Sequence, residues 1–294
     1  MTRYDHFIRL LVIISLIILG LFITAMGSAA LLLLGGTSLD ELMKMGQSGM
    51  SHLSPAATRI LLLIQHLFTF IMPGLAFGLI FYKANVFKGL RLNLAPGWIL
   101  AILGVFFLLA AYPLVNLSYI FNSTLPMPEW ATNFENEAEE TLKILLKMDN
   151  PWLFLSNLLI IAILPGIGEE LIFRGVLQKE LASIFKNPIV AIWAAAFIFS
   201  AIHLQFEGFF PRLVLGVVLG YLYYWTGNLW VCMIAHAFNN GIQIVLIYVT
   251  GMDVSKVDEQ TSSQLQWWMI PISVGVMYML YVRILKNRKP VAEN

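Results

Sequence analysis

Charge is scarce in this sequence, because only 12% of the 294 residues are Asp, Glu, Lys or Arg. Average soluble domains carry roughly twice that share. The formal net charge is +1, so we expect no broad basic face and no nucleic-acid partner. A soluble globular domain is therefore a poor description of the chain.

Cysteine is scarcer still. Cys232 is the only one and lies in an apolar run, which excludes an intramolecular disulfide and a cysteine-rich metal site. None of the five histidines is followed by Glu, so the H-E-x-x-H helix of one class of zinc proteases is absent.

Apolar residues dominate instead, at 59% of the chain with a mean hydropathy of +0.79. A helix of about 20 apolar residues crosses the hydrocarbon core of a bilayer. The sequence therefore predicts an all-α, polytopic transmembrane bundle of about eight helices, forming one integral membrane domain over 1–294. The apolar runs cover approximately 8–34, 60–82, 97–121, 151–177, 188–205, 211–225, 228–249 and 267–285.

The first run resembles a secretory signal, because Arg3 precedes it and small residues at 27–30 imitate a cleavage site. The apolar stretch continues to Leu34, however, and no soluble domain follows it. We expect a retained first transmembrane helix.

The distribution of Lys and Arg between the runs predicts the orientation. The bias places both termini in the cytoplasm, agrees with an even number of helices, and suits a multi-pass protein of the cell membrane. With the N-terminus inside, the inner segments carry Arg3, Arg9, Lys83, Lys88, Arg91, Lys179, Lys186, Arg283, Lys286, Arg288 and Lys289, and the outer ones carry Lys44, Arg59, Lys143, Lys147, Arg212 and Lys256.

The longest polar connection covers about 122–150 and is rich in Glu. Its second half, 141–148, mixes apolar residues with Lys143 and Lys147, which is typical of an interfacial helix. We favour a solvated connector, with a lid or substrate-docking segment as the alternative.

The fourth run contains Glu169, Glu170 and Arg174 where pure hydrocarbon is expected. Charged groups at membrane depth cost several kcal/mol unless they face protein or water and have partners. Glu170 and Arg174 are four residues apart, so they can pair on one helix face. Glu169 points about 100° away and is left available for proton transfer. The alternative is a salt-bridged helix end at the inner interface.

Two more runs carry polar side chains. The fifth ends with Phe199 and His203, and the seventh contains His236 and Asn240, which share a helix face at i,i+4 spacing. Buried polar groups need partners, and in an apolar bundle the nearest partners are one another. We therefore expect these residues to meet the Glu-Glu-Arg group around one pocket.

Such a set supports hydrolysis. Glu169 could take a proton from water and pass it to the leaving amine. His203, His236 and Asn240 could polarise the scissile carbonyl and stabilise the oxyanion. Glu169, His203 and His236 could instead bind zinc, since two His and one Glu form a normal catalytic zinc site. Spacing alone does not separate these mechanisms.

The chain resembles a known family at these residues. The blocks Glu169-Glu170-x3-Arg174, Phe199-x3-His203 and His236-x3-Asn240, in this order, are similar to the motifs of the CPBP family. That family comprises the type II CAAX prenyl endopeptidases and the bacterial bacteriocin-processing or abortive-infection (Abi) proteins. A glycine-spaced stretch at 216–220 and the Thr226-Gly227 turn fit as well. The resemblance covers about 150–245.

The resemblance implies an intramembrane endopeptidase with an eight-helix fold, acting on a membrane-embedded or lipidated peptide or protein. It implies Glu169 as the water-activating base, His203, His236 and Asn240 lining the site, and Glu170, Arg174 and Phe199 supporting it. We favour a metal-free glutamate mechanism in a monomer, because Asn240 suits an oxyanion donor better than a zinc ligand. The alternatives are a zinc-dependent metalloprotease and a non-enzymatic immunity or transport protein.

One expectation conflicts with this site. Glu169 lies near the inner end of its run and His203 near the outer end of its own, so their depths differ by more than about 10 Å on straight helices. Either the fourth helix continues to about Leu181, or the fifth is strongly tilted.

Overall fold

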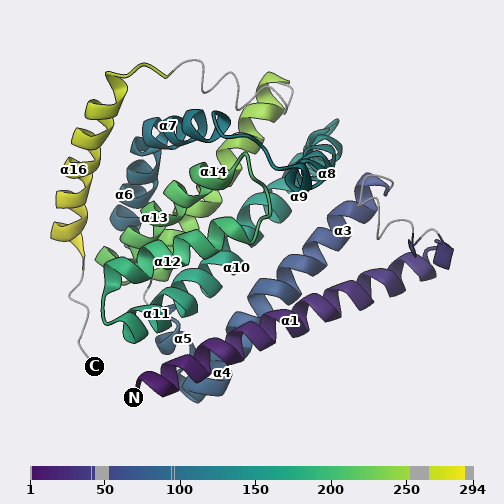
Figure 1. Cartoon of the computed structure of the whole chain (residues 1–294), viewed down its shortest axis with the longest axis horizontal. Coiled ribbons are helices and arrows are strands. Elements are labelled where there is room, and N and C mark those ends of the chain that lie inside the picture. Colours follow the sequence, from purple (N-terminus) through teal and green to yellow (C-terminus); the bar gives the residue numbers. More distant parts are fainter. Residues whose placement is uncertain are drawn as a thin grey trace.

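The computed structural model describes residues 2–40, 42–43, 53–93, 95, 97–251 and 265–288. These residues form helices and connecting turns without any strand, which confirms the predicted all-α fold (Figure 1). Six stretches of the described chain are long and apolar enough to cross a membrane. They are Arg3–Leu34, Pro55–Gly89, Trp98–Ser123, Pro151–Phe185, Leu229–Thr250 and Met269–Asn287.

The two remaining predicted runs form helices that are not among these six stretches. Pro188–Ala201 (α12) is apolar but has only 14 residues, and Phe209–Thr226 (α13) has 18. Local sequence sets the ends of both helices. Asn187 caps α12 by accepting hydrogen bonds from the first backbone N–H groups, and Gly227 ends α13 with φ +59, a conformation that favours glycine.

The longer stretches are interrupted by short π-helical, 3-10 or bent turns. Such π turns often occur at functional sites. The segments are α1 (Arg3–Leu34); α3 (Pro55–His66), η1 (Leu67–Ile71), α4 (Met72–Tyr82), η2 (Lys83–Asn85) and α5 (Val86–Gly89); α6 (Trp98–Ala110) and α7 (Tyr112–Ser123); α9 (Pro151–Asn157), η3 (Leu158–Ile163), α10 (Leu164–Ile172), η4 (Phe173–Leu177) and α11 (Gln178–Phe185); α14 (Leu229–Thr250); and α16 (Met269–Asn287).

The connector between α7 and α9 is more helical than the sequence indicated. An interfacial helix was expected only from Thr141, but α8 covers Glu129–Leu146. Its C-terminal end is held to the bundle because Arg59 Nη2 and Asn157 Nδ2 both donate to the Leu145 carbonyl, at 2.8 and 2.5 Å. Six α8 side chains also line the central cavity, which supports the lid alternative over a free solvated connector.

Glycines allow the closest helix contacts. A Cβ on Gly166 would lie 2.8 Å from the Ala237 backbone nitrogen, so α10 and α14 touch at this position. A Cβ on Gly216 or Gly220 would similarly approach α12. The glycine-spaced stretch is therefore an internal packing surface, and Gly166 brings the glutamate pair next to the helix that carries His236.

Buried apolar side chains fill the bundle interior, among them Phe77, Leu108 and Leu222, each with 0% exposure. In contrast, α1 exposes large apolar side chains along its length, with Ile18 and Phe22 60% and 62% exposed. A long helix with exposed apolar side chains fits a lipid environment. Figure 1 shows α1 and α3 running along one side of the bundle.

Candidate active site

The carboxylates lie in the middle of a long helix. Pro151–Phe185 is continuous through α9, η3, α10, η4 and α11, so Glu169 is separated from both ends by several turns. The sequence-based end of this run at about 177 was wrong, and the alternative of a helix continuing past Leu181 is confirmed. The longer helix removes the depth conflict, because Glu169 and His203 line the same cavity.

Glu170 and Arg174 form the predicted i,i+4 ion pair, and both side chains are at most 1% exposed. Arg174 also donates from Nη2 to the Gly216 carbonyl at 2.9 Å. Its guanidinium lies over the Phe199 ring, 5.2 Å from the ring centroid. A buried charge requires such partners. Phe199 thus supports the pair, as the motif implied.

His236 contacts both glutamates. Its Nδ1 is 2.8 Å from Glu170 Oε1, and its Nε2 is 3.8 Å from Glu169 Oε2. Because the Glu170 carboxylate accepts, Nδ1 is the donor in this contact, and Nε2 points to the second glutamate. The Glu170–Arg174 ion pair therefore orients the His236 imidazole toward Glu169.

His203 follows the end of α12, in the turn before α13. Its Nδ1 donates to the Phe199 carbonyl at 2.7 Å, which leaves Nε2 as an acceptor in the neutral ring. The Phe199 ring touches both His203 and His236, with centroid distances of 5.1 and 5.9 Å. This phenylalanine therefore packs between the two imidazoles.

Asn240 lies one helical turn beyond His236. Its Nδ2 donates to the Ile161 carbonyl at 3.3 Å, and its Oδ1 accepts from Asn239 Nδ2 at 3.1 Å. Tyr112 in turn donates to Asn239 Oδ1 at 3.0 Å. These bonds fix the Asn240 amide at the wall of the cavity.

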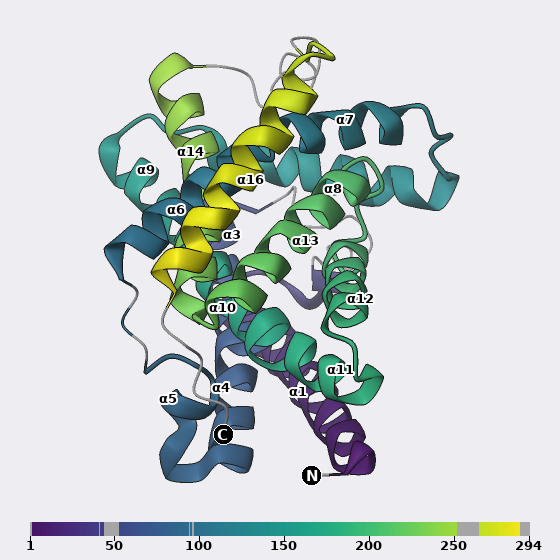
Figure 2. The same cartoon turned by 90° about the vertical axis from the view of Figure 1, so that its left-hand side faces the viewer.

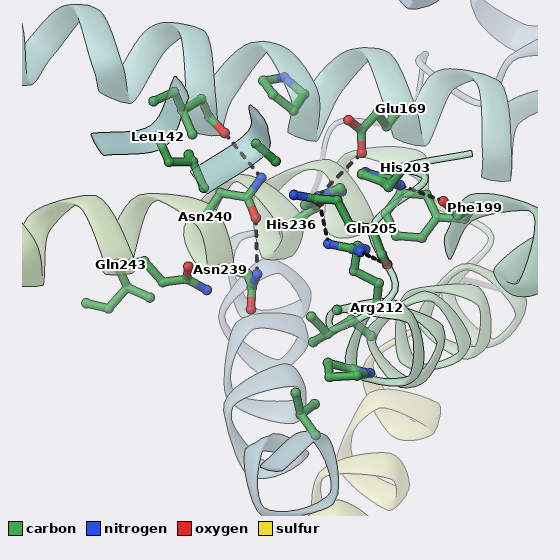
Figure 3. A pocket seen from close by; sticks show the side chains of 18 of the residues that line it. Leu142, Glu169, Phe199, His203, Gln205, Arg212, His236, Asn239, Asn240 and Gln243 are labelled. Atoms are coloured by element: carbon green, nitrogen blue, oxygen red, sulfur yellow. Dashed lines mark hydrogen bonds and ion pairs between the residues drawn. The ribbon is translucent and has the colours of Figure 1, made fainter. Parts of the chain in front are cut away.

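All four predicted catalytic side chains line one cavity of about 1320 Å³ (Figure 3). Figure 3 shows Glu169, His236 and His203 on one side of it, next to Gln205 and Arg212, with Asn239 and Asn240 farther along. Leu142 and Gln243 also line the cavity. Thus the predicted side chains from three separate spans do share one pocket.

Three groups in the cavity wall were missed by the sequence interpretation. His66 lines the cavity, and its buried Nδ1 has no hydrogen-bond partner among the described residues. Arg212 also lines it and donates to the Gln205 side chain and carbonyl at 2.8 and 2.6 Å. Asn239 is the third of these groups and also lines the cavity. The signal for His66 was a polar residue inside an apolar run.

The donor set was also tested for a metal. Glu169, His203 and His236 were the candidate zinc ligands, yet within the described part of the chain no three His, Cys, Asp or Glu side chains are grouped closely enough to hold an ion. The arrangement does not fit a three-ligand zinc site.

Together, the fold and the site define a multi-pass membrane protein with a buried Glu/His/Asn cluster at the wall of an internal cavity. Residues 151–242 match the family described as "Type II CAAX prenyl endopeptidase Rce1-like". All of the motif residues lie inside this segment. Over this segment, the match confirms the resemblance drawn from these motifs to CAAX-type intramembrane proteases.

A curated relative matches over a similar length. It is "Uncharacterized protein YpbD" of Bacillus subtilis (strain 168), which is 30% identical over 112 residues, covering 37% of this chain and 54% of that protein. The chain thus spans about half the length of the relative. No solved structure matches the chain.

Proposed function

We propose that the protein is an intramembrane endopeptidase that uses Glu169 to activate water. The observation that carries this proposal is the contact between Glu169 and His236 at the cavity wall, 3.8 Å apart. His236 is held from behind by the buried Glu170–Arg174 pair. Glu170 is thus engaged in bonds within the protein, whereas Glu169 faces a cavity that can hold a substrate.

The hydrogen bonds favour particular roles for the histidines. With its Nδ1–H directed to the Phe199 carbonyl, neutral His203 presents an acceptor, which suits it to hold a hydrogen of the attacking water. This differs from the expected role of His203 as an oxyanion donor. A proton on His236 Nε2, which lies 3.8 Å from Glu169 Oε2, would allow this ring to donate to the substrate.

The reaction then follows a balanced course. Water oxygen forms a bond with the scissile carbonyl carbon while Glu169 accepts its proton. The carbonyl oxygen becomes an oxyanion, which the Asn240 Nδ2 and protonated His236 stabilise. Glu169 delivers the proton to the amide nitrogen as the C–N bond breaks. The second water proton stays on the attacking oxygen, so the products are a carboxylic acid and an amine, which become a carboxylate and an ammonium group when that proton passes to the amine.

The proposed mechanism needs no metal. It is supported by two observations: the ligand candidates are not grouped in the described part of the chain, and Asn240, a possible oxyanion donor, lines the same cavity. The zinc-dependent alternative would require these side chains to rearrange around the ion, which would polarise the carbonyl or lower the pKa of bound water.

The proposed substrate is a membrane-associated peptide or protein, of the CAAX type or a processed peptide such as a bacteriocin precursor. A cavity of about 1320 Å³ has room for several residues of a peptide, and its wall combines apolar side chains with the polar cluster. We propose the cell membrane as its location and a monomer as its active form.

The test is cleavage of a co-reconstituted substrate by a Glu169→Gln variant. This amide keeps the side-chain shape but cannot accept the proton, so cleavage should be abolished while the thermal unfolding of the detergent-solubilised protein stays near that of the wild type. Glu140→Gln, on the exposed face of α8, is the matched control and should retain full activity. Cleavage by Glu169→Gln would refute the assignment of the base.

A further inference from the structure

The cavity occupies one end of the bundle only. On α14 its lining residues run from His236 to Thr250 and leave out the first turns after Leu229. On the Pro151–Phe185 helix they run from Ile160 to Glu169 and leave out α11. In the Pro55–Gly89 stretch, only residues of α3 from Leu62 to His66 line the cavity, and α4 and α5 contribute none. The cavity therefore lies in the half of the bundle that carries α8.

The opposite end of the bundle, here called the basic end, holds the start of α1, the α4–α5 turn and α11, which lie in the lower part of Figure 2, and the last turns of α16 point the same way. His6 Nδ1 and Arg9 Nη1 contact Glu180 at 2.5 and 3.3 Å, and Lys179 Nζ donates to the Gly89 carbonyl at 2.7 Å. Figure 1 shows α4, α5 and α11 beside the start of α1, with α8 on the far side. The described cations of the basic end are Arg3, Arg9, Lys83, Lys88, Arg91, Lys179, Lys186, Arg283, Lys286 and Arg288.

The end that carries α8 has few cations in the described residues, and they are engaged. Arg59 and Arg212 bind carbonyl and amide oxygens within the protein, and Lys143 pairs with Glu139 at 2.6 Å. Only Lys147 remains besides these. The described acidic residues of this end are Asp40, Glu129, Glu135, Glu137, Glu139, Glu140, Asp149 and Glu207.

Packed side chains separate the cavity from the basic end. Phe173, Val176 and Leu229 are at most 3% exposed, and Arg174 is 1% exposed. Gln178 adds a bond to the Gly220 carbonyl at 3.1 Å. Close-packed interiors of this kind leave no passage for a peptide. A substrate cannot enter from the basic end without opening this layer.

Lys and Arg near the ends of spans are retained on the cytoplasmic side, whereas Asp and Glu carry little topological weight. We propose that the basic end is cytoplasmic and that the cavity opens to the extracytoplasmic face. Resting on the proposed protease function, this makes the substrate class a peptide that has been exported or is exposed outside the membrane, such as a secreted precursor or the outer segment of a membrane protein.

The side of access can be tested without any substrate. Cys232 is fully buried, so Cys232→Ala provides a background with no thiol. Gln243→Cys places a thiol in the cavity wall, and Lys186→Cys places one at the exposed turn after α11. Each variant is expressed in bacterial cells and treated, intact or permeabilised, with a charged, membrane-impermeant thiosulfonate.

We expect Gln243→Cys to react in intact cells and Lys186→Cys to react only after permeabilisation. The reverse pattern, or reaction of Lys186→Cys in intact cells, overturns the proposal. If either variant fails to fold, Asp149→Cys at the end that carries α8 and Lys88→Cys at the basic end, both exposed, replace them in the same labelling experiment. Loss of cleavage in the Glu169→Gln test bears on the chemistry alone, so the failure of one proposal is distinguishable from the failure of the other.

Discussion

The matched segment, 151–242, and the N-terminal segment before it contribute to the cavity in different ways. The matched segment supplies Glu169, His203, His236 and Asn240, each held by bonds within that segment. The N-terminal segment supplies walls through α3, α7 and α8. The comparison indicates that the chemistry depends on a short, motif-bearing core, whereas the shape of the cavity and access to it depend on helices without any motif.

The largest effect on stability should come from Arg174 in the matched segment. Arg174→Met leaves the Glu170 carboxylate buried without its main partner, which costs about 3–5 kcal/mol. We expect a strong fall in the thermal unfolding temperature in detergent, together with loss of cleavage. In the double variant Glu170→Gln/Arg174→Met, stability should largely return while activity does not. An unchanged unfolding temperature for Arg174→Met would show that the pair does not hold the core together.

Gly166→Ala should have the next largest effect. Its Cβ would lie 2.8 Å from the Ala237 backbone, so α10 and α14 must separate, at about 1–3 kcal/mol for overpacking. Cleavage should fall because Glu169 moves away from His236. Gly27→Ala in α1 is the matched control, since its Cβ meets no atom within 4 Å. It should be neutral or stabilise the helix by about 0.5–1 kcal/mol. Equal effects of the two substitutions would show that close helix packing matters no more in the matched segment than in α1.

Much of this arrangement follows from local rules of sequence. Apolar runs of membrane-spanning length predicted the six candidate spans, and i,i+4 spacing predicted the Glu170–Arg174 pair, because both depend only on neighbours along one helix. Burial cost also predicted that polar residues from three spans would meet.

Other features depend on which helices are neighbours, and a one-dimensional pattern does not contain that information. His66 resembles any intramembrane histidine until α3 is placed beside α10. The role of His203 depends on its bond to the Phe199 carbonyl, which exists only in the folded turn. The end of the fourth span was missed because polar residues near Gln178 resemble a loop, although Gln178 is buried against α13 and Glu180 against α1.

His66 allows the comparison to be sharpened, because it is a polar cavity residue from the N-terminal segment. Its unpartnered Nδ1 suits it to bind the substrate rather than to transfer the reacting proton. His66→Phe should weaken substrate affinity about tenfold, the size of one lost hydrogen bond. The dissociation constant is measured in the inactive Glu169→Gln background, and His66→Gln should restore part of the affinity. An unchanged constant, or a loss explained by a lower unfolding temperature, would assign His66 to packing.

The smallest effect is expected from metal removal, which tests whether the side chains of the matched segment catalyse cleavage without an ion. Glu169, His203 and His236 are not grouped closely enough to hold an ion in the described part of the chain. Cleavage should therefore be unchanged after treatment with EDTA or 1,10-phenanthroline, and metal analysis of the purified protein should find no stoichiometric zinc. If chelation abolished cleavage and added Zn²⁺ restored it, these side chains would have to rearrange around an ion. The matched segment would then be complete only with the metal bound.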